Sequence, residues 1–114
     1  MDAASRGKVL RLLGLGVRGR LAVVGVQQVR DAALRGKLAL AVVAADASTN
    51  SRSKVVPLLK ARRIRLIEGP SASELGAAAG KETTAAIGVV DRNLADGIRA
   101  IVDQEPDGAR EEAD

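Results

Sequence analysis

Four short apolar runs, separated by segments of helical periodicity, constrain the fold of this chain more than any other feature. They are Leu21–Val24, Leu38–Ala45, Ile64–Ile67 and Ala85–Val90. Apolar runs of this length, bounded by glycine, proline or polar residues, are typical of buried strands. Helical patterns precede, separate and follow them, so helices and strands alternate along the chain. Such alternation predicts an α/β protein, a three-layer α/β/α sandwich with a four-stranded mixed sheet covered by helices on both faces.

Local capping signals predict where several helices begin. Ser5 is expected to be the N-cap of the first helix, and Asp91 that of the last. Ser71, followed three residues later by Glu74, forms the pattern of a capping box. Pro57 lies within an otherwise helical segment and predicts either a kink or the first turn of a second helical piece.

The length of 114 residues fits a single domain over residues 1–103. Residues 104–114 are polar and acidic, and we expect them to form a disordered tail. The N-terminus lacks the apolar core of a signal peptide, and the longest apolar run is far below the roughly 20 residues that span a bilayer. We therefore expect a cytoplasmic protein, a monomer, with no membrane association.

The residue types that are missing exclude several function classes. The chain contains no Cys and no His, which excludes disulfides, thiolate nucleophiles, Ser-His-Asp triads and His-ligated zinc. It also contains no aromatic residue, which excludes RNA-binding modules that stack bases on aromatic rings. The remaining Asp, Glu, Lys, Ser and Thr residues show no spacing typical of a catalytic site. We expect no enzymatic activity, no metal and no cofactor.

The charge is divided unevenly along the chain. Residues 1–67 hold 14 Lys and Arg against 3 acidic residues, a net of +11, while residues 68–114 hold 4 against 11, a net of −7. A basic half in a small domain indicates a polyanion binder, although solvated surface arginines would give the same count. RNA is favoured over a membrane because no helix pairs a basic face with a bulky apolar one that carries Trp or Phe.

The segment between the first two apolar runs is the best candidate for the binding site. Gly25 interrupts the chain and opens a helix that carries Gln27 and Gln28 in its first turn. A helix N-terminus offers unpaired backbone N–H groups and a partial positive charge, which suit a phosphate-bearing partner. The basic residues that flank or interrupt this segment are Arg18, Arg20, Arg30, Arg35 and Lys37.

A glycine run, Gly14–Gly19, matches the pattern G-x-G-x-x-G of dinucleotide-binding folds. That motif requires a strand before it and a helix after it, and here the predicted order is reversed. Glycines at the end of a helix are an ordinary stop signal. A small nucleotide-dependent enzyme is therefore the weakest of the hypotheses.

Several motifs occur in an order that resembles a known family. They are Gly25 opening a helix that ends at Arg35-Gly36, the strand that ends at Asp46, Pro57-Leu58-Leu59, and Leu75–Gly80, which fits L-G-x-A-x-G. The chain resembles, from about Arg6 to Val102, the kink-turn-binding ribosomal proteins of the archaeal L7Ae and L30e type, and more specifically their bacterial YlxQ-like branch.

The resemblance implies a non-catalytic RNA-binding protein associated with ribosomes or another RNA–protein particle. The family's pattern Gly-x-Asn-Glu-x-x-Lys, which contacts tandem G·A pairs, falls on Gly25, Gln27, Gln28 and Asp31. Asp31 puts a negative charge where the family has a cation, and its spacing from Arg35 predicts a surface ion pair. The family's second RNA-contacting segment falls on the polar loop of Lys81, Glu82, Thr83 and Thr84.

The leading hypothesis is that the N-terminus of the second helix and this loop form one edge that docks a structured, kink-turn-like RNA, surrounded by the five flanking cations. The alternative is a protein-interaction module on the same fold, because a fold does not fix a function.

Overall fold

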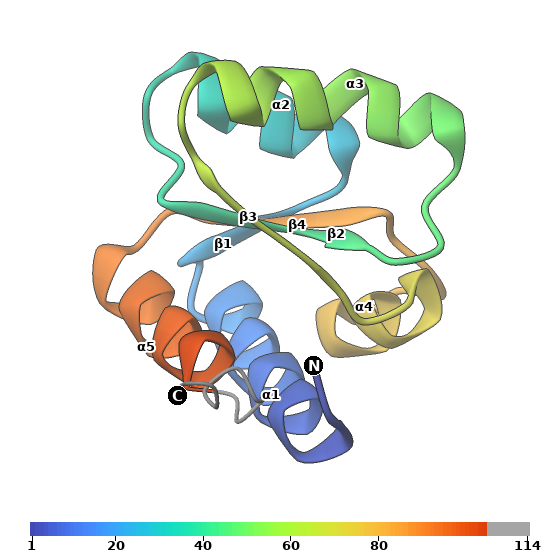
Figure 1. The fold of residues 1–114 in the computed structure, drawn as a ribbon, viewed down its shortest axis with the longest axis vertical. Helices are drawn as coiled ribbons and strands as arrows, with labels where there is room; N and C mark the ends of the chain where they lie inside the picture. The colour runs from blue at the N-terminus through green and yellow to red at the C-terminus, as the bar shows by residue number, and fades with distance from the viewer. Residues whose placement is uncertain (105–114) are drawn as a thin grey trace, which may run out of the picture.

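The computed structural model describes residues 1–104 as an alternation of helices and strands (Figure 1). The predicted tail lies outside the described residues, apart from Gln104. In order, the elements are α1 (Ala3–Arg18), β1 (Ala22–Val24), α2 (Val26–Leu34), β2 (Leu40–Ala44), α3 (Thr49–Ala61), β3 (Arg65–Gly69), α4 (Ala72–Ala79), β4 (Ala86–Val89) and α5 (Arg92–Asp103).

The four strands form one mixed sheet in the order β1-β4-β2-β3. β4 runs antiparallel to both β1 and β2, and β2 runs parallel to β3, so β1, β2 and β3 all point the same way. Helices α2 and α3 cover one face of the sheet, and α1, α4 and α5 cover the other (Figure 1). The predicted α/β/α sandwich is confirmed.

The core consists of two aliphatic layers on either side of the sheet. Val9, Leu13, Leu75 and Ile98 pack beneath α1, α4 and α5, and Val29 belongs to the layer beneath α2 and α3. Every residue of β2 and β4 is buried. Strands covered on both faces read as continuous apolar runs, which is why these strands were visible in the sequence.

The predicted helix starts are partly confirmed. The capping box of Ser71 and Glu74 is present, and Asp91 caps α5 by accepting the Leu94 N–H. The prediction for Ser5 is wrong, because α1 begins two residues earlier and the Asp2 side chain accepts the Ser5 N–H. Asp and Ser are about equally good N-caps, so residue preference alone did not distinguish Asp2 from Ser5.

No second helical piece begins at Pro57, because α3 runs without interruption through this residue. Proline lacks an N–H group, so it leaves the carbonyl of Ser53 without its helical donor. Both Ser53 and Pro57 are exposed, so water can replace the missing bond.

Four helices end in the same left-handed turn, in which two successive N–H groups bond back to the last helical carbonyls. The residue in the left-handed conformation is Arg20 after α1, Gly36 after α2, Arg63 after α3 and Gly80 after α4. A side chain in this conformation costs about 1 kcal/mol relative to glycine. A cation near a helix C-terminus stabilises the helix by about 0.3–1 kcal/mol, which does not exceed this cost. Helix stability alone therefore does not favour arginine over glycine.

Within residues 1–104, no helix is both long and apolar enough to cross a lipid bilayer.

Candidate nucleic-acid interface

The register of the strands divides the predicted site residues between two opposite edges of the sheet. Ala22, Val89, Leu40 and Arg65 form one row across the four strands, at the N-terminal ends of β1, β2 and β3. The residues that precede these strands therefore lie at one edge, and those that follow them lie at the other.

We call the edge beyond the C-terminal ends of β1, β2 and β3 the glutamine edge. It contains Gly25, Gln27, Gln28 and the loop Lys81–Thr84. The Gly25 N–H donates to the carbonyl of Ala86 over 2.9 Å, which places the start of α2 beside the chain that follows this loop. The structure thus brings together the helix N-terminus and the loop, as predicted.

Gly25 gives the start of α2 two unusual properties. Its backbone angles, φ 102° and ψ 155°, belong to a region that only glycine occupies readily. Glycine also has no side chain to cap the helix. Each of the other four described helices has a capping side chain, from Asp2, Ser48, Ser71 or Asp91. The first-turn N–H groups of α2 are therefore not used by a side-chain cap and can meet an external acceptor.

Gln27 is held in one orientation by Asp31. The Gln27 Nε2 donates to Asp31 Oδ1 over 3.0 Å, so the side-chain oxygen of Gln27 is left for another donor. The expected ion pair between Asp31 and Arg35 is not formed among the described contacts, and that prediction is wrong. The amide four residues before Asp31 competes for the same carboxylate and takes it.

The loop at this edge is fixed by its contact with α4. A Cβ atom on Gly76 would lie 2.5–2.6 Å from backbone atoms of Glu82 and Thr83, so only glycine allows this approach. Thr84 is buried, its N–H donates to Ala72, and its hydroxyl donates to Ala86 over 3.3 Å. Lys81, Glu82 and Thr83 are exposed and form the accessible part of the loop.

Carboxylates tie the segments of this region together. Asp46 Oδ1 accepts the Ala72 N–H over 2.8 Å, joining the end of β2 to the start of α4. Glu68 forms an ion pair of 2.8 Å with Arg52, which lowers the pKa of Glu68. The pKa of Glu74 is also lowered, mainly because the backbone N–H of Ser71 donates to its carboxylate.

Most of the predicted cations lie elsewhere. Arg20 precedes β1, and Arg35 and Lys37 precede β2, so these three lie at the opposite edge from Gly25. The Arg30 guanidinium donates to the backbone carbonyl of Lys54 on α3 and is turned away from the helix start. The Arg18 guanidinium lies against Gly14, on the side of α1 that approaches α4.

We call this opposite edge the arginine edge, and it includes two cations that were not among the predicted site residues. Arg62 and Arg63 end α3 and precede β3. The run Lys60–Arg63 is visible in the sequence, but only the strand register shows that it lies beside the other cations. The arginine edge consists of Arg20, Arg35, Lys37, Arg62 and Arg63.

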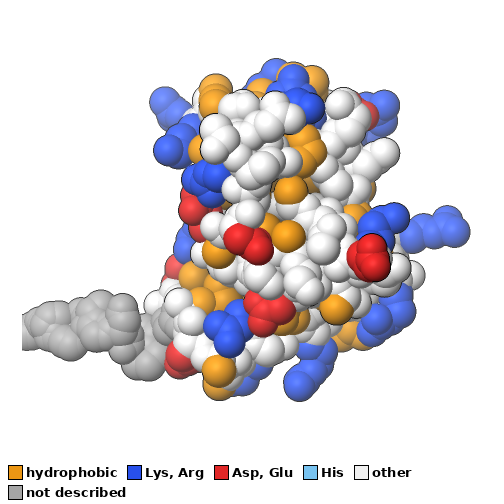
Figure 2. Space-filling view, turned by 90° about the vertical axis from the view of Figure 1, so that its right-hand side faces the viewer, with side chains coloured by type: hydrophobic (Ala, Val, Ile, Leu, Met, Phe, Trp, Pro, Cys, Tyr) orange, Lys and Arg blue, Asp and Glu red, His pale blue; other side chains and the backbone are white. Residues whose placement is uncertain are grey.

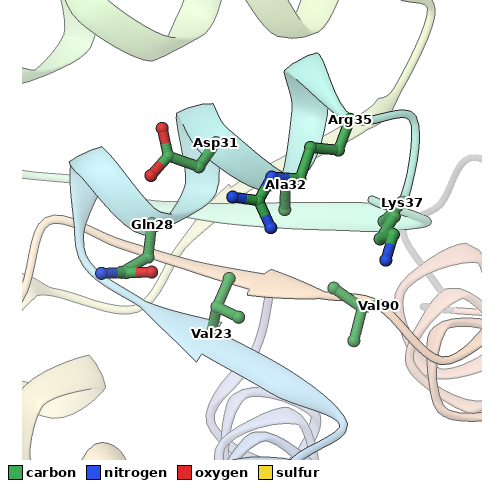
Figure 3. Close-up of a pocket in the computed structure, with 7 residues that line it drawn as sticks. All are labelled: Val23, Gln28, Asp31, Ala32, Arg35, Lys37 and Val90. Atoms are coloured by element: carbon green, nitrogen blue, oxygen red, sulfur yellow. The ribbon is translucent and has the colours of Figure 1, made fainter.

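A shallow pocket of about 250 Å³ joins the two edges along α2. Val23, Ala32 and Val90 provide apolar lining, and the polar lining comes from Gln28, Asp31, Arg35 and Lys37. The Arg35 guanidinium points back over α2 towards Ala32, and the Lys37 ammonium points down towards Val90 (Figure 3).

The glutamine edge is much less basic than the sequence suggested. Figure 2 looks onto the side of the molecule where α2 and α4 begin, and its centre is mostly neutral and apolar, with small acidic patches. The Lys and Arg side chains lie mostly towards the margins of this face. Its attraction for an anion therefore comes mainly from helix N-termini.

The glycine run has a packing explanation. Gly14 and Gly16 lie inside α1, where added Cβ atoms would come within 3.2 Å of the Ala78 carbonyl and 2.4 Å of the Leu94 side chain. They allow α4 and α5 to approach α1 and form no phosphate-binding turn. Among residues 1–104, no group of three or more acidic, His or Cys side chains is placed to hold a metal ion.

The chain is a small α/β/α sandwich built on one mixed sheet, and its second helix begins at Gly25 without a side-chain cap. The model of the ribosomal protein L7Ae/L30e/S12e/Gadd45 family matches residues 8–97, and the chain belongs to that family. This confirms the resemblance found in the sequence. Members of the family are non-catalytic, so the expectation that the chain is not an enzyme is also confirmed.

The solved structures that are similar to the chain include the following two. A protein of unknown function from Bacillus halodurans is 30% identical, with a TM-score of 0.78 over 85% of this chain and 98% of that one. The 15.5kD RNA binding protein of Giardia lamblia is 19% identical, with a TM-score of 0.77 over 90% of this chain and 88% of that one. The second likeness shows the fold alone. No curated protein matches the sequence significantly.

Proposed function

We propose that this protein binds RNA without catalysis and docks a structured, kink-turn-like RNA at the glutamine edge. The observation that carries the proposal is the start of α2, which is uncapped, opened by Gly25 and flanked by two exposed glutamines, in a member of a ribosomal-protein family. A structural relative is itself an RNA-binding protein.

Different groups at this edge would position the RNA and recognise its bases. The N–H groups of the first turn of α2 and the nearby Lys81 attract phosphate oxygens, which sets the orientation of the RNA. Gln27 presents its side-chain oxygen to a base donor, because its amide nitrogen is bonded to Asp31. Gln28 has no such bond among the described residues and can offer both an amide donor and an acceptor.

The family suggests the wider setting. A monomer in the cytoplasm, associated with the ribosome or another RNA–protein particle, is the arrangement that we propose. None of the side chains at the glutamine edge has the chemistry of a nucleophile or a general base paired with an orienting group.

An RNA-binding titration at two salt concentrations tests the proposal. It compares a kink-turn RNA, the same RNA with its G·A pairs replaced, and an unrelated structured RNA. We expect the intact kink-turn to be preferred by at least roughly tenfold, since a good base contact contributes about 1–3 kcal/mol. Equal binding to all three RNAs would contradict kink-turn recognition, and no binding would favour the protein-interaction alternative.

A double variant tests whether Gln27 and Gln28 recognise the G·A pairs of the kink-turn. Gln27→Ala with Gln28→Ala should abolish the preference for the intact kink-turn and leave the salt dependence almost unchanged. Asn93→Ala, which removes an exposed amide from α5, is the matched control and should keep the preference.

A further inference from the structure

We propose that the arginine edge is a second RNA-binding surface, which contacts the phosphate backbone of a different stretch of the RNA. This inference rests on the proposed function for the identity of the partner. The protein would then hold two RNA segments, one at each edge of its sheet.

The arginine edge gathers cations from segments that are distant in the sequence. Arg20, Lys37 and Arg63 each lie two or three residues before the strand that follows, at the starts of β1, β2 and β3. Strands lie about 4.8 Å apart, so the four-stranded row spans about 15 Å. The starts of β1, β2 and β3 and the ends of α2 and α3 lie together at the left of Figure 1.

The cations at this edge have no acidic partners within residues 1–104. All five side chains are exposed, and the ion pairs of the described chain involve other arginines. Carboxylates near this edge are already engaged: Asp91 caps α5, and Asp103 pairs with Arg65 over 2.7 Å. Asp31, which lines the pocket with Arg35 and Lys37, accepts a hydrogen bond from Gln27. Repulsion among the cations is therefore not relieved internally, and an external polyanion would relieve it.

The backbone conformation of two of these arginines also supports a ligand at this edge. Arg20 and Arg63 occupy left-handed positions, with φ values of 64° and 56°, where α2 and α4 use glycine. Helix capping gives no net reason to prefer arginine there. A strained residue that bears an exposed charge is better explained by contact with a ligand than by folding.

Arg62 holds the surface together. Its guanidinium donates to the carbonyls of Ala33 and Leu34, at 3.3 Å and 3.5 Å, and so joins the C-terminal ends of α2 and α3. Arg35 directly follows α2, and Arg63 lies two residues after α3, so both lie close to these joined helix ends. Arg35 and Lys37 also line the pocket on the flank of α2, so a backbone bound here could continue towards the glutamine edge (Figure 3).

An RNA backbone fits this surface better than an acidic protein segment does. The five exposed cations are spread across the end of the sheet, and the pocket that Arg35 and Lys37 share with Val23, Ala32 and Val90 is shallow. Such a surface suits regularly spaced charge better than the apolar side chains of a peptide. Arginine also forms paired hydrogen bonds with phosphate oxygens, which suits a backbone contact without base readout.

The double variant Arg20→Gly with Arg63→Gly tests the inference. Both changes remove a charge and relieve an unfavourable backbone conformation, so the melting temperature should be unchanged or higher. The matched control, Lys8→Gln with Arg11→Gln, removes two exposed charges from the middle of α1 and gives the same net charge. Affinities are measured at several salt concentrations for the kink-turn RNA with a long duplex arm and with that arm trimmed away.

We expect the wild type to bind the long RNA at least about tenfold more tightly than the trimmed one. The arginine-edge variant should lose this difference, and its salt dependence should fall by about 0.9 for each phosphate contact removed. The control variant should keep both. An arginine-edge variant that binds the long RNA like the wild type would overturn the inference, as would an equal loss in the control.

The two proposals fail in different ways. If only the glutamine double variant loses binding, the arginine edge is not an RNA surface and the proposed function stands. If only the arginine-edge variant loses binding, the proposed docking site is wrong and the arginine edge stands. Poly-glutamate is the competing partner. If it binds more tightly than RNA does, with the same salt dependence, then RNA is not the partner of this edge.

Discussion

In the two proposals, the edges of the sheet attract anions by different physical means. At the glutamine edge the attraction comes from the uncapped backbone N–H groups at the start of α2, whose positions are fixed by the fold. At the arginine edge it comes from long side chains at the ends of α1, α2 and α3. Fixed dipoles suit selective docking, and flexible cations suit contact with a backbone of any sequence.

The largest expected effect concerns the loop at the glutamine edge. In Gly76→Ala the new Cβ would lie 2.5–2.6 Å from the backbone of Glu82 and Thr83, so α4 and the loop must separate. Overpacking of this kind costs about 2–3 kcal/mol, which chemical denaturation would measure. Gly7→Ala, in an open position on α1, is the control and should stabilise by about 0.5–1 kcal/mol. A tolerated Gly76→Ala would mean that the loop is not held in this position.

A second prediction tests the role of Asp31 at the glutamine edge. Asp31→Lys adds a cation beside the helix start and removes the acceptor that orients Gln27. We expect affinity for all structured RNAs to rise by up to about tenfold near 0.1 M salt, since each phosphate contact changes the salt slope by about 0.9. Discrimination between intact and G·A-replaced kink-turns should fall. Asp31→Asn, which keeps an acceptor without the charge, should retain the discrimination, and its loss there would contradict this role for Asp31.

The sequence predicted the layers of this fold well, and the division of the site poorly. The capping box of Ser71 and the cap of Asp91 are local patterns, and the buried strands are continuous apolar runs. The strand order depends on contacts between distant segments, which no local pattern records. Arg20 and Gly25 are near neighbours in the sequence, yet β1 lies between them and places them at opposite edges. The direction of Arg30 towards α3 was equally invisible, because its partner is a backbone carbonyl.

A third prediction concerns the internal support of the arginine edge. Arg62→Gln removes the bonds to the carbonyls of Ala33 and Leu34, and it should destabilise the protein by about 1 kcal/mol. RNA discrimination at the glutamine edge should be unaffected, because α2 is fixed there by Gly25 and β4. The control is Arg63→Gln at the next position, because the Arg63 side chain forms no such bond in the described structure. Equal destabilisation by both variants would show that charge, and not the bond, stabilises this edge.

The smallest expected effect is on the pH dependence of stability, through Glu74 at the start of α4. The folded-state pKa of Glu74 is lowered, chiefly by the Ser71 N–H, so its contribution to stability is complete above the ordinary value of 4.5. That contribution decreases as the pH falls through the lowered folded-state pKa. Glu74→Gln keeps an acceptor for the cap but cannot titrate, so its stability should fall less steeply in acid than that of the wild type. Comparing denaturation midpoints of both proteins at neutral and acidic pH measures this difference. Parallel loss in both proteins would mean that other carboxylates account for the acid sensitivity. Asp103 is one such carboxylate, because its hydrogen bonds with Arg65 lower its pKa.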